Sequence, residues 1–318
     1  MTLADIAAAP WGTSLARVFA FAWGCIWGSF VNVVVYRVPR ELSVVRPGSH
    51  CPSCGAPVRA VDNVPVVSWL LLGGRARCCG GRISPRYPVI ELLGGLLALA
   101  IFESVVRGLP AGASLASGGS VFLADFALAM ALVAAAFIDA EHMLVPDAIT
   151  IGGTIFGIAT PALRGLSWLD VVVGASVGFV GIWLPFIVAY KALRGRHGMG
   201  LGDAKLVMLA GAWFGWRGAV FALFAGALQA TLAALVLVLV RGKIDEPESV
   251  LRQREELERA AAGGDDEARR LLVEDPLGAP PAPGLMSARM PFGPFLCCAI
   301  IEWMLAGRWI EERWGLGP

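Results

Sequence analysis

Apolar runs long enough to cross a lipid bilayer recur along this chain, and they constrain its fold more than any other feature. A spanning helix needs about 20 mostly apolar residues. By this measure the sequence predicts eight membrane helices, near residues 14–36, 88–107, 121–138, 147–163, 169–190, 204–216, 218–240 and 292–307. Only 16% of the 318 residues are charged, whereas soluble domains carry about 25%. We therefore predict an all-α polytopic membrane protein.

The positions of arginine and lysine predict how these helices are oriented, because cytoplasmic loops are enriched in both residue types. Segment 37–87 carries eight arginines, whereas segment 108–120 carries neither residue. A second basic group directly precedes a glycine-rich run and consists of Lys191, Arg194, Arg196 and His197. We expect both termini outside, with the first loop and the glycine-rich run at the cytoplasmic face.

These boundaries divide the chain into five segments. We expect a first membrane helix (1–36), a cysteine-bearing cytoplasmic loop domain (37–87), a helical membrane core (88–240), a charged insert (241–290), and a last helix with its tail (291–318). The insert is rich in charged residues, Ala, Pro and Gly, with a Pro-rich stretch at 278–284. Such a composition is typical of short helices joined to disordered chain.

The glycine-rich run reads Gly198-Met-Gly-Leu-Gly-Asp-Ala-Lys205 and lies between two apolar segments. Its aspartate, Asp203, therefore lies at a helix N-terminus next to lipid, and ionisable residues at membrane depth mark functional sites. Gly200 and Gly202 allow the backbone to bend tightly and another segment to approach closely. Taken alone, the string is also compatible with a plain turn that carries a solvated aspartate.

A second aspartate, Asp139, directly follows an apolar helix and lies at the same predicted membrane boundary as Asp203. Two carboxyl groups that share a site do not easily both ionise, so one keeps a proton while the other acts as a base. This arrangement is what aspartyl hydrolysis of a peptide bond requires. The helix dipole favours Asp203 as the anion. Asp147, after Pro146, is expected to cap the following helix.

Membrane-embedded carboxylates and a glycine-broken segment are also typical of ion-coupled transporters. Such a protein should show internal repeats and binding groups near the bilayer midplane. The sequence shows no repeat, and both aspartates fall at one boundary. We therefore favour the hydrolase and keep the transporter as the alternative.

The cytoplasmic loop contains Cys51 and Cys54 in a CxxC motif, followed by the adjacent pair Cys78 and Cys79. Cytosolic loops rarely keep disulfides, so four thiolates at this spacing favour a structural zinc site. A repeated CxxC would place a cysteine at Ala76, so Cys78 has to substitute for it. His50 is an alternative ligand in place of one sulfur.

Glu91 falls about one turn inside the second apolar helix, where a carboxylate needs a partner or water. We expect it to have a structural or substrate-positioning role rather than a catalytic one. At the end of the first helix, small residues such as Gly28 favour close helix packing, and Asn32 can hydrogen-bond across a helix pair.

Six segments together resemble the type IV prepilin leader peptidases, bacterial inner-membrane aspartyl proteases of the GxGD class. They are residues 28–39, 51–54, 83–91, 138–147, 200–206 and 291–295. The resemblance implies cleavage of short basic leader peptides from prepilins or pseudopilins, after a glycine and at the cytoplasmic face. It also implies that Asp139 and Asp203 are the catalytic pair. Supporting residues of the catalytic loop would be Gly200, Gly202, Lys205 and Asp147.

Larger members of that family, which carry a cysteine-bearing loop, also methylate the new N-terminus with S-adenosylmethionine. This chain has such a loop, but Ala76 departs from the family's second CxxC motif, and the insert is longer than the family's usual connection. The expected partners are pilin precursors and the lipid bilayer, with no nucleic acid.

Overall fold

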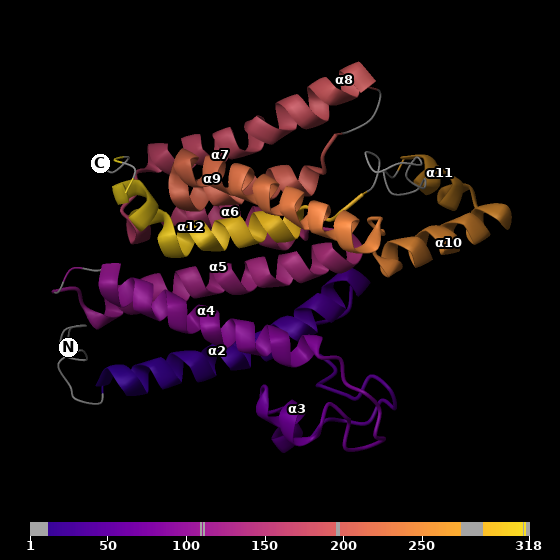
Figure 1. Cartoon of the computed structure of the whole chain (residues 1–318), viewed down its shortest axis with the longest axis horizontal. Coiled ribbons are helices and arrows are strands. Elements are labelled where there is room, and N and C mark those ends of the chain that lie inside the picture. The colour runs from indigo at the N-terminus through magenta and orange to yellow at the C-terminus, as the bar shows by residue number, and fades with distance from the viewer. Residues whose placement is uncertain are drawn as a thin grey trace. The chain divides into compact units, whose positions relative to one another are not determined.

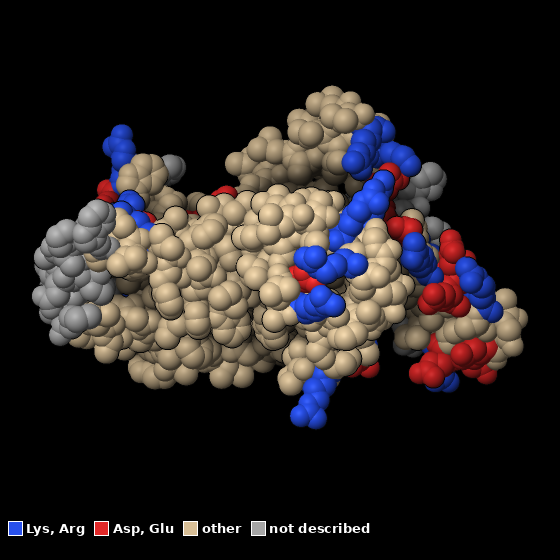
Figure 2. All heavy atoms as spheres, turned by 90° about the horizontal axis from the view of Figure 1, so that it is seen from below, with Lys and Arg blue, Asp and Glu red and all other residues tan. Residues whose placement is uncertain are grey.

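The computed structural model describes residues 12–108, 110, 112–194, 198–274, 289–313 and 315, and within these ranges it is helical and has no β-strand (Figure 1). Six of the described helices are long and apolar enough to cross a membrane. On the face drawn in Figure 2, broad areas of surface carry no Lys, Arg, Asp or Glu side chain, and the charged side chains lie in separate groups. The predicted all-α polytopic membrane fold is confirmed. Arg196, His197 and the Pro-rich stretch 278–284 lie outside the described residues.

Residues 1–134, here called the N-terminal unit, form one compact unit. Its helix α2 (Gly12–Arg37) packs along α4 (Arg86–Gly108). A Cβ added at Gly24 would overlap the carbonyl oxygen of Gly94, and one at Gly28 would lie 2.7 Å from the Cα of Glu91. Asn32 Nδ2 donates to the carbonyl oxygen of Tyr87 at 3.1 Å. The predicted close packing and the polar bridge between the two helices are both confirmed.

The loop between α2 and α4 is largely irregular. It contains two 3-10 turns (Val38–Arg40 and Ala60–Asn63) and the short helix α3 (Val67–Leu71). Buried Arg37 closes the start of this loop, because its guanidinium donates to the carbonyl oxygens of Ser43 at 2.9 Å and Pro47 at 2.7 Å.

Helix α5 (Leu115–His142) leads into residues 135–318, here called the C-terminal unit. This unit contains α6 (Asp147–Ala159), α7 (Trp168–Ile182), α8 (Tyr190–Arg194), α9 (Leu201–Arg241) and α12 (Gly293–Arg313). A π-helical stretch (Trp183–Ala189) joins α7 to α8 at Pro185, which has no N–H for the regular helical ladder. Helix α9 packs against α6, α7 and α12, and its fully buried side chains include Leu206 and Leu209.

Two predicted helices, 204–216 and 218–240, belong to the single element α9, but its helical geometry breaks at Gly215. The φ of +69° and ψ of −174° at this residue are accessible to glycine and strained for other residues. The predicted turn is therefore present, as one glycine inside a continuous hydrogen-bonded element. Eight predicted apolar segments therefore give six long helices, because two of them merge into α9 and a third forms α6, which has only 13 residues.

The charged insert folds into α10 (Glu248–Ala262) and α11 (Asp266–Glu274), which pack against each other. The prediction that part of the insert forms short helices is confirmed. Arg254 of α10 is buried, so this helix does not simply project into solvent.

Candidate functional site

Asp139 lies near the C-terminal end of α5 and is buried. Its Oδ2 accepts a hydrogen bond of 2.9 Å from the backbone N–H of Gly293, the first residue of α12. A Cβ at Gly293 would lie 2.7 Å from the same oxygen. Only glycine at this position therefore lets the backbone reach the carboxyl group without displacing it.

Asp203 lies in the first turn of α9 and is half-buried. It has a backbone hydrogen bond with Gly200, the N-cap residue, and it interacts electrostatically with Asp139. Cys297 of α12, which is buried, interacts electrostatically with both aspartates. Two carboxyl groups from segments far apart in the sequence therefore share one environment at the ends of their helices.

The supporting residues of the glycine-rich run connect α9 to the start of α6. Lys205 Nζ lies 2.6 Å from Asp147 Oδ1, and a Cβ at Gly202 would lie 3.0 Å from the Cβ of Val145. The expectation that Asp147 caps α6 is wrong: Pro146 occupies the N-cap position, and no side chain caps the helix. The carboxylate of Asp147 pairs with Lys205 instead.

The glycines of this run serve close approach and not an unusual backbone conformation. Gly198, Gly200 and Gly202 are absent from the described glycines with positive φ, and Gly200 has a φ of −72°. The tight contact of Gly202 with Val145 confirms one of the two predicted reasons for glycine. The other reason, a left-handed bend, does not apply here.

The four loop cysteines lie on two backbone turns with the same hydrogen-bond pattern, here called the first knuckle (50–57) and the second knuckle (75–82). In the first, Gly55 N–H donates to Cys51 O and Cys51 N–H to Ala56 O. In the second, Gly80 N–H donates to Ala76 O and Ala76 N–H to Gly81 O. The match places Ala76 where the first knuckle has Cys51, and Cys78 where it has Ser53.

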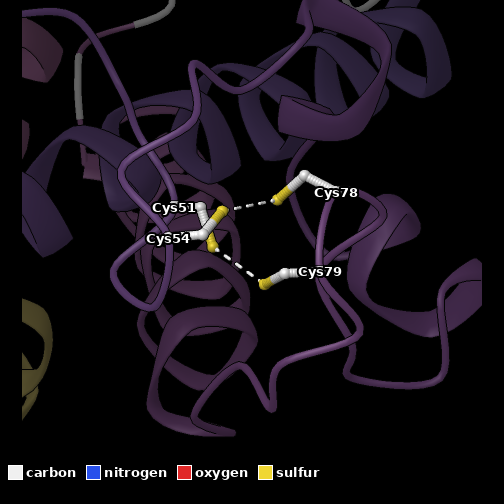
Figure 3. A group of neighbouring side chains, drawn as sticks. All are labelled: Cys51, Cys54, Cys78 and Cys79. Atoms are coloured by element: carbon white, nitrogen blue, oxygen red, sulfur yellow. Dashed lines mark hydrogen bonds between the residues drawn. The ribbon is translucent and has the colours of Figure 1, made fainter.

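The sulfur atoms nevertheless converge, as Figure 3 shows. Cys51 Sγ lies 3.7 Å from Cys79 Sγ, and Cys54 Sγ lies 3.4 Å from Cys78 Sγ. All four atoms lie within 4.8 Å of one another. Tetrahedral zinc with Zn–S bonds of about 2.3 Å separates its sulfur ligands by about 3.8 Å. The four thiols therefore fit a metal ion, and His50 is not part of the described cluster.

The thiols of this cluster differ in acidity. Backbone donors at Ser53 and Cys54 lower the pKa of Cys51 to about 6. Hydrogen bonding with Cys54 raises the pKa of Cys78 to about 12, and the pKa of Cys79 is also raised. Neighbouring thiolates repel one another, and a divalent cation removes that conflict because it holds its thiol ligands deprotonated.

Glu91 is buried near the start of α4. Its Oε2 accepts a 2.7 Å hydrogen bond from the N–H of Val66, and its carboxyl group also hydrogen-bonds to Ser29. Both partners belong to the N-terminal unit. Glu91 therefore joins the loop to the helix pair of this unit.

Sequence reasoning did not identify Gly293 as a neighbour of Asp139. Residues 291–295 read Pro-Phe-Gly-Pro-Phe and are one of the segments that carry the family resemblance, but the resemblance assigns no partner to Gly293. One signal could have indicated this contact: Gly293 begins a helix, and the first backbone N–H groups of a helix have no partner within it, so they can donate to a nearby carboxyl group.

Comparisons with known proteins match both parts of the chain. Residues 22–105 match the Bacterial Peptidase A24 N-terminal domain, and residues 126–237 match the Type IV leader peptidase family. No solved structure matches the chain.

Curated relatives named prepilin leader peptidase/N-methyltransferase align over most of their own length. The one from Myxococcus xanthus is 33% identical and covers 94% of this chain and 92% of the relative. The Aeromonas hydrophila relative is 35% identical over 73% of this chain and 83% of its own length. The Neisseria gonorrhoeae relative is 34% identical over 74% and 85%, respectively. This chain belongs to the type IV leader peptidase family.

Proposed function

We propose that this chain is a membrane aspartyl endopeptidase that removes the leader peptides of type IV prepilins and pseudopilins at the cytoplasmic face of the bacterial inner membrane. We also propose that it methylates the N-terminus that cleavage exposes. The observation that carries the peptidase proposal is the meeting of Asp139 and Asp203, from two different helix ends, beside the N-terminus of α12. The names of the relatives support both activities.

In the proposed hydrolysis, one aspartate accepts a proton from water as the water oxygen attacks the scissile carbonyl carbon. The other aspartate, in its protonated form, polarises the carbonyl and then protonates the leaving nitrogen. Because Asp139 Oδ2 accepts the hydrogen bond from Gly293, a proton held by Asp139 belongs on Oδ1. The assignment of Asp203 as the anion rests on the helix dipole alone.

Lys205, Asp147, Gly200 and Gly202 are proposed to hold the catalytic loop in place. The ion pair between Lys205 and Asp147 ties the first turn of α9 to the first turn of α6. It lies two residues from Asp203, so it limits how far that carboxyl group can shift. Rigid placement of catalytic groups matters because a displacement of about 1 Å can reduce a rate by about 100-fold.

For the second activity, we propose that Cys51, Cys54, Cys78 and Cys79 hold a structural zinc ion that shapes the loop. S-adenosylmethionine, when bound, would supply a methyl group attached to a positively charged sulfur. The neutral amine nitrogen of the new N-terminus would form the new N–C bond, and the electron pair of the broken S–C bond would remain on sulfur. An α-amino group has a pKa of about 7.7, so a substantial fraction is neutral near pH 7. The protein's task is therefore to position the amine and to exclude water.

Co-expression with a pilin precursor tests the peptidase proposal. Wild type should remove the leader, whereas Asp139→Asn and Asp203→Asn should each lower the rate by at least about 100-fold, since each removes an acid–base group. Asp125→Asn, on the same helix α5 as Asp139, is the matched control and should process normally. Normal processing by both catalytic variants would defeat the proposal that these two aspartates carry out the hydrolysis.

A further inference from the structure

The N-terminal unit contains a cavity of about 560 Å³ that the peptidase chemistry does not use. Its walls come from the C-terminal half of α2, both cysteine knuckles, α3 and the start of α4. Cavities of this size commonly hold small-molecule ligands or cofactors. Its polar and aromatic lining residues include Asn32, Tyr36, Asp62, Trp69, Tyr87 and Glu91.

Asn32 leaves an unused hydrogen-bond acceptor at this cavity. The side chain is 1% exposed, and its Nδ2 donates to the carbonyl oxygens of Tyr87 at 3.1 Å and Gly28 at 3.4 Å. These two acceptors fix which way the amide points. Its Oδ1 is buried and has no hydrogen-bond partner within the described ranges. Buried polar atoms rarely remain unpaired, so a ligand with an N–H or O–H donor fits here.

Glu91 provides negative charge without a matching cation. Its partners, Val66 N–H and Ser29, are neutral, and the described residues include no ion pair to it. By contrast, Asp62 at the same cavity pairs with Arg77 at 2.9 Å. A buried carboxylate is stabilised by an opposite charge, so the ligand that suits Glu91 is a cation.

The residue that binds Glu91 has a strained backbone. Val66 has a φ of +63° and a ψ of −51°, and Val67 N–H donates across it to Pro65 O. This γ-turn is unfavourable for a β-branched residue. Strained conformations persist where surrounding structure holds them, and they gather at ligand sites. The turn presents the Val66 N–H to Glu91 and so fixes the carboxyl group at the cavity.

Aromatic side chains complete the cavity. Trp69 donates its indole N–H to Ile83 O at 3.1 Å, which fixes the ring beside the cavity. Tyr36 and Tyr87 line it as well. Aromatic rings stack on nucleobases, and their faces attract cations. Arg37, Arg59 and Arg77 also line the cavity; Arg37 donates to backbone carbonyl oxygens and Arg77 pairs with Asp62. A ligand that combines an adenine, hydroxyl and amine donors, a carboxylate and a positive charge therefore fits the lining.

We propose that this cavity binds S-adenosylmethionine, with Glu91 facing the cationic part of the ligand and Asn32 Oδ1 accepting from a donor on it. The inference rests on the methylation part of the proposed function and assigns it to residues of the N-terminal unit. Cys51 and Cys78 also line the cavity. The metal cluster therefore forms part of its wall, which explains how a structural metal supports methyl transfer without contacting the reacting atoms.

The test measures binding directly, with the full chain in lipid nanodiscs and methyl-labelled S-adenosylmethionine in equilibrium dialysis. Glu91→Gln keeps an acceptor for Val66 N–H but removes the charge, and Asn32→Leu removes the free acceptor. Each should weaken binding by about tenfold or more. The matched control is Glu103→Gln, on the same helix α4 but paired with Arg17 and Arg107, and it should bind as wild type does.

Ultraviolet cross-linking of the labelled ligand should mark peptides that contain Trp69 or Tyr87. Wild type that binds no S-adenosylmethionine, or equal binding by Glu91→Gln, would overturn the cavity assignment. Leader removal by the same nanodiscs reports separately on the peptidase, because Asp203→Asn should lose leader removal and keep full ligand binding. Loss of binding in Asp203→Asn would also count against a site confined to these residues.

An independent observation concerns the charged insert. Glu246, whose side chain is 5% exposed, lies 2.9 Å from Arg254 of α10 and 3.3 Å from Arg289. Ser249 Oγ of α10 donates to the carbonyl oxygen of Glu141. The insert thus contacts two segments that flank the catalytic site: Glu141 is two residues beyond Asp139, and Arg289 is four residues before Gly293.

We infer that these contacts make the insert a positioning element for Asp139. The buried ion pairs of Glu246 hold the chain that leads into α12, and Gly293 at the start of α12 donates to Asp139. Ser249 holds the end of α5, which carries Asp139 itself. Both sides of the Gly293–Asp139 hydrogen bond are therefore fixed by one short segment of the insert, 246–254.

Kinetics of leader removal in nanodiscs test this role. Glu246→Gln should lower kcat by about tenfold and leave KM within about twofold, and Glu246→Asp should restore most of kcat. Glu248→Gln is the matched control, since Glu248 is exposed and pairs with Arg252 on the same helix. Ser249→Ala removes one neutral contact and should give a smaller loss of kcat at an unchanged Tm. An unchanged kcat in both Glu246→Gln and Ser249→Ala would overturn the inference.

Discussion

In the N-terminal unit the chemically notable side chains lie on irregular loop backbone, whereas in the C-terminal unit they lie at the ends of long helices. The four thiols are brought together by two knuckles, each closed by its own backbone hydrogen bonds. The two aspartates lie on α5 and α9, beside the start of α12; these helices are ordered by their own backbone hydrogen bonds, and α9 also packs against α12.

This difference indicates what each site needs in order to keep its shape. A loop of this kind buries little apolar surface, and a metal ion can supply its stability. A site between helices needs close backbone approach instead, which the chain obtains with glycine at Gly202 and Gly293. Removal of the metal should therefore reduce N-methylation, whereas substitution of these glycines should reduce leader removal.

The largest effect should come from Gly293→Ala. The added Cβ would lie 2.7 Å from Asp139 Oδ2, so either the carboxyl group or the start of α12 must move. We expect leader removal to fall by about 100-fold, the loss typical of a catalytic group displaced by about 1 Å. Cleavage of a pilin precursor by purified enzyme measures this rate.

The control for this variant is Gly152→Ala on α6, where an added Cβ meets nothing within 4 Å. It should cleave at close to the wild-type rate. Metal content and S-adenosylmethionine binding should be unchanged in Gly293→Ala. If both fell together with leader removal, the two sites would not be separable in the way proposed.

A smaller effect, confined to the other activity, should follow metal removal. With the metal stripped by a chelator, or in Cys54→Ser, the knuckles lose the cation that holds their thiolates together. We expect N-methylation of the mature pilin to fall by about tenfold or more, and leader removal to stay within about threefold of wild type. Mass spectrometry of the pilin N-terminus separates the two products.

Added zinc should restore methylation to the chelated wild type and not to Cys54→Ser. Equal loss of cleavage and methylation would contradict the division of labour between the units. A chain that retains full methylation after metal removal would show that the cluster does not support that activity.

How far the sequence could predict these sites depends on the range of the interaction. Asp139 and Asp203 were identifiable because each adjoins an apolar run. This is a local feature of the sequence, and an ionisable residue next to such a run marks a functional site because its burial is costly. The convergence of Cys78 with the other thiols followed from counting ligands in two short motifs. The Gly293–Asp139 contact joins residues 154 positions apart, and no local pattern encodes that pairing.

Local reasoning also failed where a distant partner competed with a nearby one. Asp147 has the sequence position of a helix cap, yet its carboxylate pairs with Lys205, 58 residues away. A charged partner at 2.6 Å outweighs a neutral backbone N–H, since charge-assisted hydrogen bonds are about twice as strong. The cavity beside Glu91 was likewise beyond sequence reasoning, because its walls come from five separate segments: the end of α2, the two knuckles, the α3 region and the start of α4.

The smallest expected effect tests the two knuckles against each other. Their backbone hydrogen bonds match, and Ala76 of the second knuckle occupies the position that Cys51 has in the first. The second knuckle instead supplies its thiol from Cys78, two residues further on. Moving the thiol in the double variant Ala76→Cys/Cys78→Ala should restore two equivalent CxxC turns. We expect one zinc ion per chain, affinity equal to or up to about tenfold tighter than wild type, and methylation within about threefold.

Elemental analysis and chelator competition measure the metal in this series. Cys78→Ala alone should lose zinc, while Ser53→Ala, at the matching position of the first knuckle, should keep it. Retention of zinc by Cys78→Ala would mean that three cysteines suffice and that Cys78 is not a ligand. Loss of zinc in the double variant would mean that the second knuckle holds its ligand correctly only from position 78, so that the matching hydrogen bonds do not make the two turns interchangeable.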